Sequence, residues 1–152
     1  MQRMVVEDFN ARPHTETVAL SPEHAPEIEQ LYATGDGGGV AFGAFQVASR
    51  FFRGIRRDGE LIAVAGVHVV SRHESVAGVG NVFTRADCRG RGLAQIATSA
   101  VVAALLEAGI ATIGLNVEHT NAPAIAAYHR LGFRTAFEYW EGPATRLANS
   151  TE

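Results

Sequence analysis

The sequence predicts one α/β domain in which antiparallel strands run into a central parallel pair of a mixed sheet, with helices on both faces. Residues 51–84 have strand composition interrupted by two turn signals, which predicts three antiparallel strands in succession. From residue 89 the pattern changes to helix, strand, helix, strand, which contains a βαβ unit and hence a parallel strand pair. The middle strand, 61–70, is apolar at almost every position, as expected of a strand covered on both faces.

The first half of the chain carries a short strand and two helical patterns. "TVAL" is expected to be a strand, and a helix over 22–33 should begin after Ser21, with Pro22 in its first position. Residues 40–49 favour a short helix, although Gly43 opposes it. Residues 1–14 are expected to form either an edge strand or a flexible arm of the single domain 1–152.

The second half alternates between the two periodicities. The expected elements are a helix over 91–108, a strand over 110–117, a helix over 121–132 and a strand over 133–140. The strands on either side of the 91–108 helix should form the parallel pair. A ligand site is then expected where those two strands end.

Composition excludes several function classes. The chain has 152 residues, a net charge of −3 and 47% hydrophobic residues, which argues against a broad basic surface for nucleic acid or for a membrane. The single cysteine, Cys88, forms no internal disulfide, and no Cys/His spacing resembles a metal site. Without a signal peptide or a long apolar run, a cytoplasmic protein is the expectation.

The stretch "CRGRGLA" places two glycines directly before a helical pattern. A helix N-terminus presents unpaired N–H groups, and Gly90 and Gly92 would let an anion approach them closely. The P-loop pattern and the dinucleotide-binding pattern both fail here, the second because Gln95 stands where a glycine or alanine is required. What remains is R-x-x-G-x-A from Arg89 to Ala94, which a plain strand-to-helix turn would also explain.

A second motif lies downstream, and the two motifs are interpreted together. The segment from Asn121 to Phe133 reads N-x-x-A-x-x-x-Y-x-x-x-G-F. Together the two motifs resemble those of the GNAT N-acetyltransferase superfamily, and the resemblance extends over about Leu61 to Trp140. It implies the GNAT fold and transfer of an acetyl group from acetyl-CoA to a primary amine. The amine would attack the thioester directly in a ternary complex.

The resemblance also implies which residues hold acetyl-CoA. The strand before the loop would be bulged, so that it separates from its parallel neighbour, and Gly78 and Gly80 suit such a bulge. A backbone N–H near Val82 would polarise the thioester carbonyl. The implied cofactor-binding residues are Val82, Phe83, Thr84, Arg89, Gly90, Arg91, Gly92, Leu93, Ala94, Asn116 and Asn121. No metal is implied.

For catalysis the resemblance implies Tyr128 as the general acid that protonates the departing thiolate. The glutamate that many family members carry on the bulged strand is absent, because Val79, Gly80 and Asn81 stand there. The base is therefore open: Asn81 would orient a water, or Glu118 would act directly. His119 and the hairpin residues His73 and Glu74 are further candidates.

Two other functions stay open at this stage. A non-catalytic acyl-CoA-binding or sensor domain would keep the cofactor loop and lack a base. A nucleic-acid-binding module using Arg85, Arg89 and Arg91 is opposed by the net charge. The acceptor is expected to be a small-molecule or peptide amine, with Phe42 and Phe45 suggesting a partly apolar pocket, and a homodimer is a further hypothesis.

Overall fold

A mixed sheet of seven strands is the centre of the computed structural model, which describes residues 1–13, 15–35 and 42–139. The strand order is β2-β3-β4-β5-β6-β1-β7, and among these described strands only β5 and β6 pair in parallel. This confirms the predicted mixed sheet with its central parallel pair. The strands are β1 (Gln2–Val6), β2 (Thr17–Ala19), β3 (Arg53–Arg57), β4 (Glu60–Ser71), β5 (Val76–Thr84), β6 (Thr112–Val117) and β7 (Phe133–Glu138).

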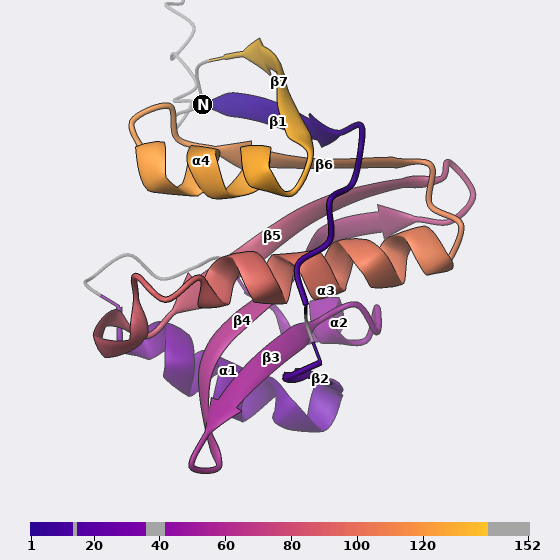
Figure 1. The fold of residues 1–152 in the computed structure, drawn as a ribbon. Helices are drawn as coiled ribbons and strands as arrows, with labels where there is room; N and C mark the ends of the chain where they lie inside the picture. Colours follow the sequence, from indigo (N-terminus) through magenta and orange to yellow (C-terminus); the bar gives the residue numbers. More distant parts are fainter. Residues whose placement is uncertain (14, 36–41, 140–152) are drawn as a thin grey trace, which may run out of the picture.

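Helices cover both faces of the sheet, as predicted (Figure 1). One face carries α3 (Leu93–Glu107), which packs against β3, β4 and β5, and the other carries α1 (Ala25–Ala33) and α2 (Ala44–Val47). The remaining helix, α4 (Ala122–Arg130), packs against β7. Short 3-10 turns lie at Pro22–His24 and at Ala86–Cys88.

The predicted helix over 40–49 is a single turn in the described residues, and 40–41 lie outside them. Gly43 stands at its N-cap with an extended backbone, so the helix begins only after this glycine, which would be unfavourable in a helix interior. The short α2 leaves part of β4 uncovered. Leu61 to Val67 are buried, as predicted for a doubly covered strand, but His68 and Val69 are exposed.

The N-terminal segment differs from the expected edge strand or flexible arm. Strand β1 lies inside the sheet, antiparallel to β6 on one side and to β7 on the other, and Met4 is fully buried. In the described part of the sheet, the edge position on this side belongs to β7 instead. The inner position is stabilised because the backbone groups of β1 find partners on both sides and the Met4 side chain is buried.

Candidate active site

The site begins where the two parallel strands separate. The ladder between β5 and β6 runs from Val76 paired with Thr112 to Val79 paired with Leu115 and ends there. Strand β5 continues to Thr84. From Gly80 onward, the edge of β5 that would pair with β6 is open to a ligand, because the ladder has ended.

A bulge in β5 causes this separation. Val64 pairs with Phe83 and Gly66 with Gly80, so β5 has one more residue than β4 over this stretch. Asn81 takes up the extra residue with a φ of +56°, in the left-handed region that side chains other than glycine seldom adopt. An extra residue bends the bulged strand away from its neighbour. The predicted bulge is therefore present, one position beyond Gly80.

Asn81 is held in this conformation from two sides. Its carbonyl oxygen accepts a hydrogen bond of 2.6 Å from the Tyr32 hydroxyl, and its Nδ2 donates to Oε1 of Gln46 at 3.1 Å. Burial raises the pKa of the Tyr32 phenol, so this hydroxyl keeps its proton. Helices α1 and α2 thus fix the backbone of the bulge.

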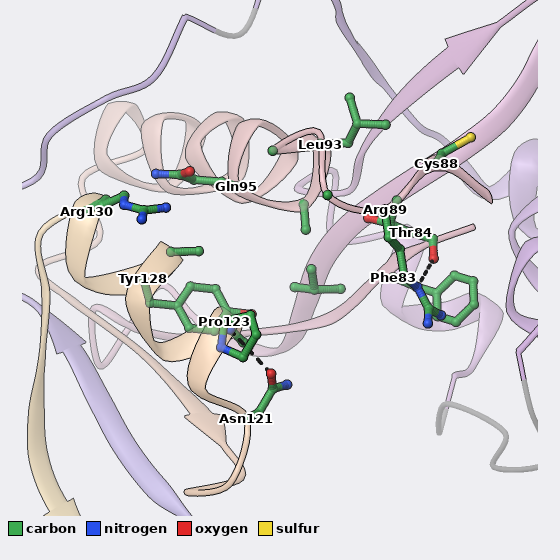
Figure 2. Close-up of a pocket in the computed structure, with 16 residues that line it drawn as sticks. Phe83, Thr84, Cys88, Arg89, Leu93, Gln95, Asn121, Pro123, Tyr128 and Arg130 are labelled. Carbon is green, nitrogen blue, oxygen red and sulfur yellow. Dashed lines mark hydrogen bonds between the residues drawn. The ribbon is translucent and has the colours of Figure 1, made fainter. Parts of the chain in front are cut away.

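A cleft of about 560 Å³ follows from the separation of the strands. Figure 2 shows Tyr128 and Pro123 of α4 on one side of it and Phe83, Thr84 and Arg89 on the other. Its lining comes from the end of β5, the loop into α3, the start of α3 and one face of α4. The lining residues are Val82, Phe83, Thr84, Cys88, Arg89, Gly90, Gly92, Leu93, Ala94, Gln95, Asn121, Pro123, Ala124, Ala127, Tyr128 and Arg130.

The N-terminus of α3 opens into this cleft. Gly90 and Gly92 have φ angles of +80° and +75°, and a Cβ added at either would meet no atom within 4 Å. Their glycine identity is therefore required by the backbone conformation and not by crowding. No side chain in the described part of the chain caps this helix, so the first N–H groups and the positive end of the helix dipole face the cleft.

Two buried polar atoms beside this helix end have no hydrogen-bond partner among the described residues. They are Thr84 Oγ1 and Gln95 Nε2, whose residues are 9% and 4% exposed. The other amide atom of Gln95, Oε1, accepts from Nη1 of Arg12 at 3.1 Å. Unpaired buried donors are costly, and both atoms belong to cleft residues. The donor set therefore fits an anionic ligand.

The two arginines of the turn differ in position. Arg89 lines the cleft, donates from Nε to the carbonyl oxygen of Thr84 at 3.0 Å, and places its Cζ 5.6 Å from the centre of the Phe83 ring. Arg91 is exposed and does not line the cleft. Arg89 is thus the one of this pair that is held at the cleft.

Asn121 lines the cleft and also caps α4. Its Oδ1 accepts from the backbone N–H of Ala124 at 3.3 Å, and Pro123 occupies the first turn of the helix. The cap leaves the amide NH2 group of Asn121 available to a ligand in the cleft. A contact between Asn121 and a cofactor stays a prediction.

Tyr128 lies on the face of α4 that borders the cleft. Its ring packs at 60° to the Phe133 ring with 5.9 Å between the centroids, and burial raises its pKa to about 12. The phenol is thus protonated at neutral pH and able to donate a hydrogen bond into the cleft.

Four predicted site residues do not line the cleft: Asn81, Arg91, Asn116 and Glu118. Asn116 is exposed, and its side-chain oxygen accepts from Nε of Arg3 on β1. Glu118 is exposed in the loop after β6, where its carbonyl oxygen accepts from the N–H of Asn121. Asn81 is buried in the bulge beneath the cleft. The catalytic roles of Asn81 and Glu118 stay predictions.

Sequence reasoning did not assign the cleft residues Cys88, Gln95, Pro123, Ala124, Ala127 and Arg130. One signal could have found part of the set. Ala124, Ala127 and Tyr128 follow the i, i+3, i+4 spacing of one helix face, and small residues beside a tyrosine leave room for a ligand.

The comparison with known families agrees with this geometry. The sequence model of the acetyltransferase (GNAT) family matches residues 7–133. The chain belongs to this family. The matched range contains the bulged strand, the glycine turn and Tyr128, so the site described above lies within the GNAT domain.

Curated relatives of this GNAT chain carry the name mycothiol acetyltransferase. The protein of Corynebacterium jeikeium is 53% identical over 47 residues, which are 31% of this chain and 14% of that protein. The protein of Actinosynnema mirum is 39% identical over 83 residues, which are 50% of this chain and 28% of that protein. The matches thus span less than a third of the length of either curated relative.

Solved GNAT structures share the fold. An acetyltransferase of this family from Novosphingobium aromaticivorans superposes with a TM-score of 0.73 at 30% identity, over 88% of this chain and 58% of that one. The ribosomal-protein-S18-alanine N-acetyltransferase of Escherichia coli gives 0.62 at 23% identity, over 76% and 75%. The second likeness concerns the fold alone.

Residues 1–13, 15–35 and 42–139 contain no group of three or more His, Cys, Asp or Glu side chains that could hold a metal ion. None of the helices in these ranges has the length and apolarity needed to cross a bilayer.

Proposed function

We propose that this GNAT domain transfers an acetyl group from acetyl-CoA to a primary amine. The observation that carries the proposal is a single continuous cleft with three parts. One end has the uncapped α3 N-terminus and the unpaired polar atoms of Thr84 and Gln95, the other side has the Tyr128 hydroxyl, and the open edge of β5 runs between them.

The residues at the α3 end fit a pyrophosphate. The N–H groups at Leu93 and Ala94 lie in the first turn of the helix, where an anion is stabilised by the helix dipole. Gln95 Nε2 supplies a further donor, and Arg89 supplies a positive charge at the wall of the cleft. Val82, Phe83 and Thr84 would offer their open backbone edge to the pantetheine arm, as an added strand does.

When bound, acetyl-CoA supplies a thioester whose carbonyl carbon accepts the amine. The backbone N–H near Val82, at the bulge, would stabilise the charge that develops on the carbonyl oxygen. Tyr128 would donate its hydroxyl proton toward the departing sulfur. Both groups are held before the reaction, the first by the bulge and the second by packing against Phe133.

Cys88 supports direct transfer and not an acyl-cysteine step. It is 1% exposed, and its Sγ lies between the guanidinium groups of Arg57 and Arg85, at 3.9 Å and 3.8 Å. A thiol that is buried in this way is inaccessible to a thioester. We therefore propose a ternary complex without a covalent enzyme intermediate. The proposed location is the cytoplasm.

The acceptor is proposed at the level of a primary amine on a small molecule or peptide. Phe42 packs against the rings of Tyr32 and Phe52, whereas Phe45 is 78% exposed, so only the second is free to meet an acceptor. Because the curated relatives are named for mycothiol, amines that also carry a thiol belong among the candidates.

One experiment tests the proposal against the sensor alternative. Calorimetry measures CoA binding, and mass spectrometry follows acetylation across a panel of alkyl amines, amino acids, cysteine esters and short peptides. We expect binding together with acetylation of at least one amine. Binding without acetylation of any amine would favour a non-catalytic acyl-CoA-binding domain, and absence of binding would contradict both functions.

A further inference from the structure

His68 occupies an unusual place in the sheet. Val67 pairs with Val79 and Val69 with Gly78, so His68 is an extra residue in β4, opposite the Gly78–Val79 part of β5 that comes just before the bulge. Such an insertion redirects a side chain. His68 is exposed, although the seven residues before it, Leu61 to Val67, are all buried.

The imidazole lies directly against Gly80. A Cβ added at Gly80 would overlap Cδ2 and Nε2 of His68, whereas a Cβ at Gly78, on the same face, would make an ordinary contact of 3.4 Å with Val69. Gly80 therefore lacks a side chain because the histidine ring occupies its place. The ring edge that carries Nε2 faces β5.

This contact places the imidazole at the point where β5 and β6 separate. Gly80 is the first residue after the last parallel pair, Val79 with Leu115, and Asn81 of the bulge follows it. The gap lies in the plane of the sheet, so groups on either face reach it. Phe83 illustrates this, because it lines the cleft while its ring meets Tyr32 of α1 on the other face.

The distance between the His68 imidazole and a thioester carbonyl held near the N–H of Val82 suits a nitrogen nucleophile placed between them. Two fully extended residues span about 7 Å, so Gly80 and Val82 lie at most that far apart, because Asn81 between them is in the left-handed region. A hydrogen bond from an amine to a base and the approach of that amine to a carbonyl carbon together span about 6 Å. An acceptor amine would thus fit between Nε2 of His68 and the thioester.

A network of hydrogen bonds keeps the two strands in this register. Gln46 of α2 accepts from Asn81 Nδ2 at 3.1 Å and from the N–H of Gly43 at 3.1 Å, and its Nε2 donates to the carbonyl oxygen of His68 at 3.4 Å. The backbone of His68 and the side chain of the bulge residue are thus tied to one glutamine. Asn81 itself is a neutral amide and accepts no proton, so it is a positioning residue here.

We propose that His68 is the general base that takes a proton from the acceptor amine; this assignment rests on the proposed acetyl transfer. The acceptor ammonium loses one proton to His68, and the freed lone pair bonds to the thioester carbonyl carbon. The C–S bond breaks with its electron pair left on sulfur, which Tyr128 stabilises by donating a hydrogen bond. The second proton lost by the nitrogen ends on the sulfur, and the proton on His68 passes to solvent.

Two pairs of matched variants test the assignment. His68→Gln removes the base, and its control is His73→Gln at the exposed hairpin tip, a residue that this proposal excludes as the base. Gly80→Ala keeps His68 but displaces its ring, with Gly78→Ala as its control. For an alkyl ammonium acceptor we expect His68→Gln to lower kcat/KM by about 10²-fold or more. Gly80→Ala should lower kcat/KM as well, while both controls and CoA affinity stay at wild-type values.

The outcomes separate this assignment from the proposed function. Hydroxylamine, which is uncharged at neutral pH, should lose far less activity in His68→Gln than the alkyl amine does. In the wild-type protein, NMR signals of the His68 ring should shift when the alkyl amine is added with CoA, and those of His73 should not. If the His68→Gln variant keeps the turnover of the wild-type protein, the His68 assignment alone is overturned. A wild-type protein inert toward every amine overturns the acetyl transfer and the assignment with it.

Discussion

Replacing Tyr128 by phenylalanine removes one hydroxyl group from the cleft and leaves the ring that packs against Phe133. The pKa of Tyr128 is about 12, because burial favours the neutral phenol. A thiol has a pKa near ~8.5, so complete proton transfer from Tyr128 to a thiolate would be uphill by about 5 kcal/mol. The hydroxyl therefore contributes mainly as a hydrogen-bond donor to the developing thiolate.

The expected size of the effect follows from that role. A hydrogen bond to a charged group contributes about 1.5–3 kcal/mol, which corresponds to a fall in kcat of about 10- to 150-fold in Tyr128→Phe. CoA affinity and the melting temperature should be unchanged, because the ring remains.

The assay is acetyl-CoA consumption under saturating amine, with calorimetric CoA titration of both proteins as the control for binding. A kcat within twofold of wild type would refute the assignment of Tyr128 to the leaving sulfur. A large loss of CoA affinity in the variant would refute the structural reasoning, because it would mean that the hydroxyl holds the ground-state ligand.

Three further predictions concern the turn, the buried amide and the bulge. Gly92→Ala forces an alanine to a φ of +75°, and calorimetry should show weaker CoA binding; Gly59→Ala, at +81° in the β3–β4 turn, carries the same strain and should bind CoA normally. Gln95→Leu removes a buried unpaired donor together with the acceptor of the exposed Arg12 guanidinium, which water can replace, so urea unfolding should show nearly unchanged stability while CoA affinity falls about tenfold. Tyr32→Phe leaves the Asn81 carbonyl without its hydrogen bond and should cost about 1–3 kcal/mol at neutral pH. Because burial raises the pKa of Tyr32, the wild type loses stability as the pH rises above ~10, and this loss should be shallower in the variant.

The parts predicted well from sequence were those fixed by local chemistry. The helix over 22–33, the hairpin at Asp58-Gly59 and the glycine turn before α3 depend on caps and on φ angles that few residues adopt. The bulge was predictable as a region, since Gly78 and Gly80 mark it. Its centre at Asn81 was not, because hydrogen bonds from Tyr32 and Gln46, distant in sequence, hold that residue in the left-handed region.

Features that depend on long-range pairing were not predictable in this way. The pattern of β1 is that of a strand, but nothing local shows that it inserts between β6 and β7. The same holds for His68, which sequence reasoning treated as part of an apolar strand. Only the register of β4 against β5 brings its ring over Gly80. Asn116 was expected at the cofactor and instead meets Arg3, because β1 covers that side of β6.

The inner position of β1 has a consequence for the order of synthesis. Strand β1 is made before β6 and β7, with which it pairs, and the backbone nitrogen of Met1 donates to the carbonyl oxygen of Tyr139, 138 residues away. Contacts of such sequence separation slow folding, because the chain must close a long loop before they form. Until β1 has paired, β7 lacks its connection to the rest of the sheet. The same is true of α4, which packs on β7 and carries Tyr128. A nascent chain would therefore complete the cofactor loop well before it completes the wall that carries the tyrosine.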